Sequence, residues 1–296
     1  MSNMFMTQCE KTLTQPGLMD SLKAEKFDIA YSEGMDLCGF SKDFDAREFA
    51  KRFDPTMPSP KIWANASYCV YNNEPLVDFP KVITAKMFSV GGITVRNKDK
   101  PLDEYWTEIF NRRPYTFLVS FGSVCRSYLM PQHYKEGFRE AFHRLPNVTF
   151  IWKYEVAEHN VAQGCHHIRL ESGRLSAFLT HGGPGSLTEA VFAGVPMVAV
   201  PVMGDQYRNA RMVERIGTSI VIEKNELANA DRVEKALSDV LFNERYLKEA
   251  RRYSAMVNDQ LQSSRERLVS HFTFLAKFGP LRQLDHSAKN MSWISY

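Results

Sequence analysis

Residues 115–223 alternate short apolar runs with helical patterns, and this alternation restricts the fold more than any other feature of the chain. Strands are expected at 116–120, 148–152, 176–180, 197–200 and 219–222. Helices are expected between them, at 130–145, 184–193 and 206–216. Short buried strands separated by helices are typical of parallel sheets with right-handed crossovers. The predicted fold class is therefore α/β, with a doubly wound sheet.

The chain on either side of this stretch follows other patterns. Helices are expected after it, at 230–242, 244–259 and 263–278, and Gly279 and Pro280 should end the last one before a poorly ordered tail. Before it, a helix is expected at 16–24, strands at 27–31 and 66–71, and a helix or linker at 101–113. Two strands in the first 85 residues are too few for a self-sufficient domain.

Composition excludes several protein classes. The 296 residues are 44% hydrophobic and 24% charged, which excludes disorder, collagen and coiled coil. A net charge of +3 is too small to indicate a nucleic-acid partner. The start of the chain has no signal-peptide pattern, and the most apolar run, 193–204, is shorter than the ~20 residues of a membrane span, so the chain as written is expected to be soluble. Glycosylation triplets at Asn65, Asn147 and Asn290 would matter only in a secretory compartment.

A glycine-rich turn follows the strand expected at 176–180 and contains the strongest candidate ligand-binding residues of the chain. His181 and the glycines after it lead directly into the helix that begins at Pro184. A parallel sheet binds ligands at the carboxyl edge of its strands, and the free amides of a helix start attract phosphate, so a diphosphate is expected here. Glu189 lies on the same helix, where its carboxylate could accept hydrogen bonds from a ribose. Asp205 and Gln206 close the next strand at the same edge and suit sugar hydroxyls.

This run resembles the signature of the UDP-glycosyltransferases, most closely the UDP-glucuronosyltransferases of animals. The segments at 117–123, 150–155 and 62–94 resemble other parts of that family, and 23–40 is similar to part of its acceptor domain. The resemblance implies a GT-B fold of two facing Rossmann-like domains, with the N-terminal one incomplete. The division it implies is a partial acceptor-side domain at 1–86, a donor-binding domain at 87–262, and a C-terminal helix and tail at 263–296.

The resemblance also implies roles for individual residues. Ser123 and His181 would contact the diphosphate, and Gly185 and Ser186 would offer it backbone amides. Glu189 would hold the ribose, Asp205 and Gln206 the transferred sugar, and Lys153 stands where relatives often have arginine near the nucleotide. Pro184 removes one amide from the cradle. Ser123 would serve equally well as a helix N-cap. The UDP-sugar is a co-substrate, and no cofactor or metal is implied.

The family reaction is an inverting transfer of the sugar to a hydroxyl of a small lipophilic acceptor. A histidine near the start of the acceptor domain removes the acceptor's proton, and a carboxylate orients that histidine. Glu33 occupies the orienting position, although a solvated loop carboxylate is the simpler interpretation. All eight histidines of the sequence lie at or after His133, so the base is missing.

Two internal junctions depart from the family pattern, after Phe40 and between Leu170 and Glu171. The second lacks a Trp-x-Pro-Gln loop whose tryptophan stacks on uracil, a contact worth about 1 to 3 kcal/mol. Weak donor binding and an inactive or weakly active, truncated or alternatively spliced form are therefore expected. The runner-up is a non-catalytic isoform that associates with an intact relative as an oligomer. The family setting would be detoxification at the lumenal side of the endoplasmic reticulum membrane, as membrane-anchored glycoproteins.

Two other site types fit the sequence less well. Residues 182–185 suggest a dinucleotide-binding loop, but they lie in the middle of the sheet, and Glu189 is too near to be the ribose acid of that motif. Cys165, His166 and His167 suggest a metal site, but adjacent side chains point apart and no further ligand recurs at zinc spacing. The five cysteines are spread singly, which gives no zinc ribbon or disulfide framework.

Overall fold

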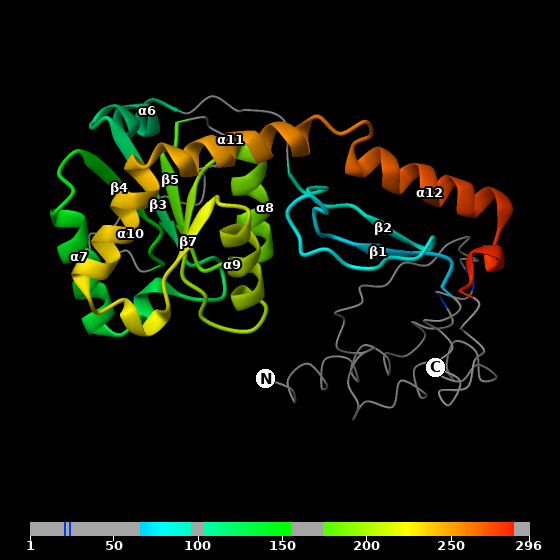
Figure 1. The fold of residues 1–296 in the computed structure, drawn as a ribbon, viewed down its shortest axis with the longest axis horizontal. Coiled ribbons are helices and arrows are strands. Elements are labelled where there is room, and N and C mark those ends of the chain that lie inside the picture. The colour runs from blue at the N-terminus through cyan, green and yellow to red at the C-terminus, as the bar shows by residue number, and fades with distance from the viewer. Residues whose placement is uncertain (1–20, 22–23, 25–65, 96–102, 156–173, 287–296) are drawn as a thin grey trace. The chain divides into compact units, whose positions relative to one another are not determined.

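The main sheet has five parallel strands in the order β4-β3-β5-β6-β7 (Figure 1). This computed structural model describes residues 21, 24, 66–95, 103–155 and 174–286. The strands are β3 (Tyr115–Ser120), β4 (Val148–Trp152), β5 (Ala177–Thr180), β6 (Met197–Ala199) and β7 (Ser219–Val221). Successive strands add outward on both sides of the β3–β5 pair, so the chain changes direction between these two strands. In open α/β sheets, such a switch point is where ligands bind.

Helices cover both faces of this sheet (Figure 1). The helices α7 (Gln132–His143) and α10 (Ala230–Phe242) pack on one face. The other face carries α6 (Glu104–Asn111), α8 (Pro184–Ala193), α9 (Gln206–Arg215) and α11 (Glu244–Asn258). Successive side chains of β3 point to opposite faces of the sheet. Phe117 and Val119 belong to the core under α7 and α10, and Leu118 belongs to the core on the opposite face.

Segments far apart in the chain form two compact units. Within the described ranges, one unit contains Asn72–Lys81 and Ser89–Ser264, and the other contains 66–71, Val82–Phe88 and 265–286. The second unit holds a two-stranded sheet of β1 (Cys69–Tyr71) and β2 (Met87–Ser89), together with α12 (Ser264–Phe278) and the 3-10 helix η6 (Arg282–Leu284). The domain division expected from the sequence differs from these units in its boundaries and remains a prediction.

Packing in the second unit centres on three rings. His271 stacks on Phe88 with centroids 3.9 Å apart, and Tyr68 meets both rings edge-on. Burial raises the pKa of the Tyr68 hydroxyl. Lys86 and Asp285 form an ion pair beside them. None of the helices that the structure describes is both long and apolar enough to span a bilayer.

The elements predicted for residues 115–278 are confirmed to within about one or two residues at each end. The strand expected at 66–71 is shorter, β1, and η6 lies in the tail that was expected to be poorly ordered. Strand β2 was not predicted, because a three-residue run is too short to show a period. Apart from residues 21 and 24, the helix expected at 16–24 and the strand at 27–31 lie outside the described residues.

Candidate functional site

The predicted site residues within the described ranges gather at the carboxyl edge of the main sheet. Ser123 follows β3, Lys153 follows β4, His181 follows β5, and Asp205 stands between β6 and α9. Because all these strands are parallel, each delivers the residues after it to the same edge. Strands β3 and β5 are the pair at the switch point, so the turn at Gly122 faces the turn at His181.

Two glycines enclose the ring of His181. A Cβ placed on Gly122 would lie 2.5 Å from Cε1 of His181, and one placed on Gly183 would lie 2.5 Å from its Nε2. Real Cβ atoms do not approach this closely, so only glycine fits at either position beside an unmoved imidazole. Gly122 also has a φ of 80°, a conformation in which other residues are strained. The imidazole is therefore held in place by backbone shape.

One ring nitrogen of His181 is left without a partner. Its side chain is buried, and Nδ1 makes no hydrogen bond with any residue that the structure describes. Burial lowers the pKa of His181; the carboxylate of Asp205 opposes this effect and the ammonium of Lys153 adds to it. An unsatisfied buried polar atom is rare in folded proteins and calls for a ligand or another specific cause.

Lys153 links the end of β4 to the turn after β3. Its Nζ donates a hydrogen bond to the carbonyl oxygen of Gly122 at 2.9 Å. Ser123, the next residue in that turn, is exposed, and the described part of the chain provides no partner for its hydroxyl. Ser123 does not cap a helix, since the next helical turn, η1 (Ser127–Leu129), has Arg126 as its N-cap. The alternative role as an N-cap is therefore wrong.

Helix α8 begins at this edge and leaves its first amides open. Its N-cap is Gly183, which has no side chain to accept from them, and Pro184 is the first helical residue, as predicted. The N–H groups of Gly185 and Ser186 therefore have no intrahelical acceptor. No atom lies within 4 Å of a Cβ placed on Gly185, so there is room for a ligand beside it. Glu189 is exposed one turn further along the helix.

Asp205 and Gln206 begin α9 and have different surroundings. Asp205 is exposed, and its Oδ2 accepts a hydrogen bond from Nδ2 of Asn209 at 2.9 Å. Gln206 is buried, and its Oε1 accepts from the backbone N–H groups of Val202 and Met203 at 2.9 and 3.0 Å. Gln206 thus fixes the turn between β6 and α9, which leaves its Nε2 as the group that could donate to a ligand.

Asn209 belongs to this site but was not predicted. It is buried, and its Nδ2 donates to Asp205 and, at 3.3 Å, to the carbonyl oxygen of Gly182. One amide therefore connects the carboxylate of Asp205 to the glycine turn after His181. The helical spacing could have suggested it, because residues four apart share a helix face. Glu33 and the cluster of Cys165, His166 and His167 lie outside the described residues.

Comparison with known sequences gives consistent matches. The family profile described as "UDP-glucoronosyl and UDP-glucosyl transferase" matches residues 46–296. The mouse UDP-glucuronosyltransferase 1-2 is 26% identical over 244 residues, which are 80% of this chain and 45% of that protein. The Caenorhabditis elegans protein ugt-48 is 26% identical over 263 residues, which are 84% of this chain and 50% of that protein. The chain spans about half the length, or less, of the curated relatives it matches.

Comparison with solved structures identifies the fold. The glycotransferase of kitacinnamycin superposes with a TM-score of 0.58 at 18% identity, covering 90% of this chain and 67% of that one. The calicheamicin glycosyltransferase CalG4 has a TM-score of 0.58 at 19% identity, covering 79% and 59%. These proteins have the GT-B fold of glycosyltransferases, so the predicted fold class is confirmed.

Proposed function

This chain belongs to the UDP-glucuronosyl and UDP-glucosyl transferase family, and from that premise we propose that the carboxyl edge of its main sheet binds the diphosphate and sugar of a UDP-sugar. The family's enzymes are transferases that use the UDP-sugar as co-substrate and need no cofactor. The observation that carries the proposal is the ring of His181, enclosed by Gly122 and Gly183 with a buried Nδ1 that has no partner among the described residues.

The proposed binding mode assigns one part of the ligand to each element. Phosphate oxygens would accept hydrogen bonds from His181 and from the free amides of Gly185 and Ser186, where the helix dipole favours negative charge. Ser123 would donate to the same group from the opposite turn. Glu189 would accept from the ribose hydroxyls, and Asp205 and Gln206 would bind the sugar.

In the proposed reaction, these residues stabilise the leaving group. An acceptor oxygen bonds to the anomeric carbon of the sugar as the bond from that carbon to the UDP oxygen breaks. The charge that develops on the diphosphate would be met by His181 and the amides of α8, and Lys153 would add a positive charge nearby. The acceptor is proposed to be a small lipophilic molecule. Its proton would have to pass to a histidine base that this sequence lacks, and Glu33 is only the orienting carboxylate that the resemblance implies.

We expect donor binding by this chain to be weak. The enzymes that this chain resembles carry a loop with a tryptophan that stacks on uracil. In this sequence Leu170 is followed directly by Glu171, so that loop is missing. Loss of one such stack reduces affinity about tenfold to a hundredfold. The transfer activity of the chain by itself is accordingly proposed to be low or absent.

Calorimetric titration with UDP, using UMP as the nucleotide that lacks the second phosphate, tests the binding. Wild type should bind UDP in preference, and His181→Gln should weaken that binding about tenfold, the value of one hydrogen bond to a charged group. His143→Ala, an exposed histidine on α7, is the matched control and should bind as wild type does. Equal affinity for UDP and UMP would overturn the proposed site.

A transfer assay with UDP-glucuronate and UDP-glucose tests the activity separately. Robust turnover of a phenolic acceptor by the chain alone would contradict the proposed low activity. UDP binding without turnover would instead fit the non-catalytic role, in which the chain associates with an intact relative. Size-exclusion chromatography of a mixture with such a relative would then show whether a complex forms.

A further inference from the structure

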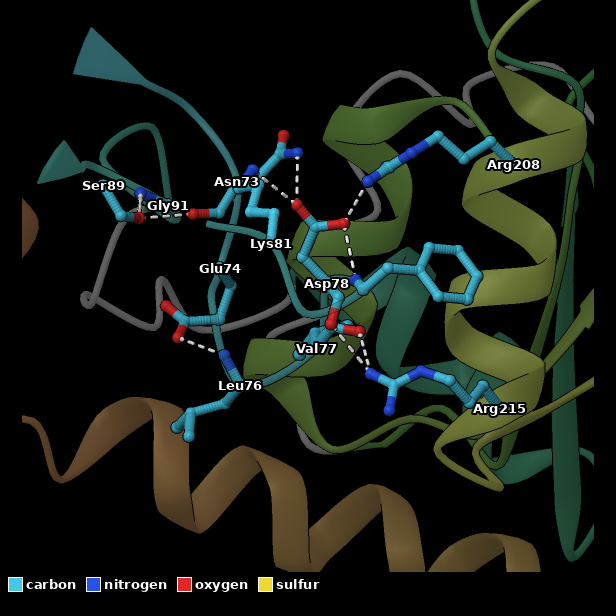
Figure 2. Close-up of polar contacts among 11 residues, drawn as sticks. Asn73, Glu74, Leu76, Val77, Asp78, Lys81, Ser89, Gly91, Arg208 and Arg215 are labelled. Atoms are coloured by element: carbon cyan, nitrogen blue, oxygen red, sulfur yellow. Dashed lines mark hydrogen bonds and ion pairs between the residues drawn. The ribbon is translucent and has the colours of Figure 1, made fainter. Parts of the chain in front are cut away.

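The segment Asn72–Lys81, called here the 72–81 segment, buries a carboxylate against α9 (Figure 2). Asp78 is 2% exposed. Its Oδ2 accepts hydrogen bonds from Nδ2 of Asn73 at 2.8 Å and from Nζ of Lys81 at 2.9 Å, and its Oδ1 accepts from the backbone N–H of Phe79 at 2.7 Å. Arg208 of α9 forms an ion pair with Oδ1. A buried carboxylate with this many donors is fixed in position.

A second arginine of α9 holds the backbone of the same segment. Arg215 donates through one nitrogen to the carbonyl oxygens of Val77 and Asp78, at 3.0 and 2.8 Å. The guanidinium groups of Arg208 and Arg215 both lie near the ring of Phe79, 5.5 and 5.4 Å from its centroid. Two turns of α9 separate these arginines, so the 72–81 segment is attached along the length of the helix.

The start of the segment is held as well. Ser89 donates through its Oγ to the carbonyl oxygen of Asn73, and Gln260 donates to the carboxylate of Glu74 at 2.8 Å. A Cβ on Gly91 would lie 2.6 Å from the backbone of Asn73, so the two backbones are in close contact there. The segment is therefore fixed before it reaches α9.

The contact surface on α9 includes the residue that positions Asp205. Arg208, Met212 and Arg215 follow one another at spacings of four and three residues, so they share one side of the helix, and Asn209 and Met212 line a small pocket together with Asn73 and Val77. Asn209 is the residue whose amide bonds to Asp205 and Gly182. Asn209 therefore lines the same pocket as Asn73 and Val77 of the 72–81 segment while it donates to Asp205.

We propose that Asp78 is a positioning residue for the donor sugar: by anchoring the 72–81 segment to Arg208, it holds the first turn of α9 so that Asn209 keeps Asp205 in place. This inference rests on the proposed binding of a UDP-sugar. Asp78 touches neither nucleotide nor sugar in this arrangement, so its effect reaches the ligand through α9. The diphosphate side, built around His181, is reached from Asn209 only through the longer hydrogen bond to the carbonyl oxygen of Gly182 at 3.3 Å, so the effect there should be smaller.

The test compares dissociation constants for UDP and for UDP-sugars. Calorimetry on the full chain would measure UDP, UDP-glucuronate and UDP-glucose with wild type, Asp78→Asn, Arg208→Met and Arg211→Met. Arg211 is the matched control, because it is on the same helix and pairs with Glu214 and Glu223. In Asp78→Asn and Arg208→Met, the ratio of the UDP-sugar constant to the UDP constant should rise about tenfold, the value of one lost charged hydrogen bond. Arg211→Met should leave this ratio unchanged.

A second readout does not require a ligand. The side-chain amide signal of Asn209 in a ¹⁵N–¹H correlation spectrum, assigned with Asn209→Ala, should shift in Asp78→Asn and Arg208→Met and stay in place in Arg211→Met. An unchanged ratio and an unchanged signal in folded Arg208→Met would overturn the inference, even if Asp78→Asn failed to fold. If wild type bound neither UDP nor a UDP-sugar, the proposed function would fail, and the Asn209 signal alone would decide the positioning role.

Discussion

The two sides of the proposed site are built by different physical means. On the diphosphate side, the backbone at Gly122 and Gly183 leaves just enough room for the ring of His181. On the sugar side, Asp205 accepts a hydrogen bond from Asn209 of α9, and the neighbouring Arg208 forms an ion pair with Asp78 of the 72–81 segment. A side that depends on close packing is damaged when one methyl group is added, whereas a side that depends on hydrogen bonds is damaged when one partner is removed.

The largest loss of stability is expected on the diphosphate side, which depends on close packing. Gly122→Ala adds a Cβ against His181 at a φ of 80°, so both overpacking and backbone strain apply. Together they should lower the free energy of unfolding by about 3 kcal/mol and weaken UDP binding. Urea denaturation followed by circular dichroism measures the loss. Gly217→Ala is the control, since its φ of 76° is similar but its nearest neighbour is Glu249 at 3.6 Å. Equal losses in the two variants would mean that the fit around His181 contributes nothing.

A smaller loss of stability is expected on the sugar side, which depends on hydrogen bonds and ion pairs. Asp78→Asn should lower the free energy of unfolding by about 2 kcal/mol at pH 7, because a charged hydrogen-bond acceptor is lost while Arg208 can still reach solvent. Asp231→Asn is the control; Asp231 pairs with Arg144 at the surface, where the loss should stay below about 0.5 kcal/mol.

The effect of pH on that loss is also predicted. Burial alone would raise the pKa of Asp78, but the hydrogen bonds from Asn73, Lys81, Arg208 and the N–H of Phe79 outweigh it and hold the pKa well below its usual range. The native carboxylate therefore stays ionised when the unfolded chain takes up a proton, at about pH 3.9. The stabilisation is complete above that pH and declines as the pH falls below it. The difference between wild type and Asp78→Asn should be constant from pH 7 to 5 and shrink below pH 4; a difference that grew on acidification would contradict this assignment.

The smallest effect concerns His181, where the two sides meet electrostatically. Lys153→Met removes a positive charge that lowers the pKa of His181, so this pKa should rise; Asp205→Asn removes the opposing negative charge, so it should fall. Burial, the larger cause, is the same in both variants. An NMR titration of the His181 ring protons measures both shifts. Shifts in the same direction would show that the charges of Lys153 and Asp205 do not act on His181 as the geometry implies.

Local patterns were sufficient to predict the main sheet. The helix beginning at Pro184 and the strand at 148–152 were expected at the bounds they have, because proline at a first helical turn and a five-residue apolar run are strong local signals. The gathering of Lys153, His181 and Asp205 at one edge also followed, since parallel strands end together. The roles of these residues toward a ligand remain predictions.

Contacts between distant parts of the chain could not be predicted in this way. Asp78 reads as one of many surface carboxylates in the sequence, and nothing near it indicates that Arg208 and Arg215 will surround it. The enclosure of the His181 ring, whose Nδ1 has no partner among the described residues, depends likewise on the close approach of Gly122, which follows another strand. The hydrophobic period of a sequence indicates whether one segment forms a helix or a strand. Whether a charged side chain is buried depends on contacts between elements that are far apart in the sequence.

The long separation between Asp78 and Arg208 sets an order of events during synthesis. Asp78 leaves the ribosome 130 residues before its arginine partner, which at about 5–20 residues per second is a delay of roughly 7 to 26 seconds. Until then, its aspartate is solvated and its apolar residues have no surface to cover. The segment can reach Arg208 only after α9 has been synthesised, so its contacts with that helix form late in folding.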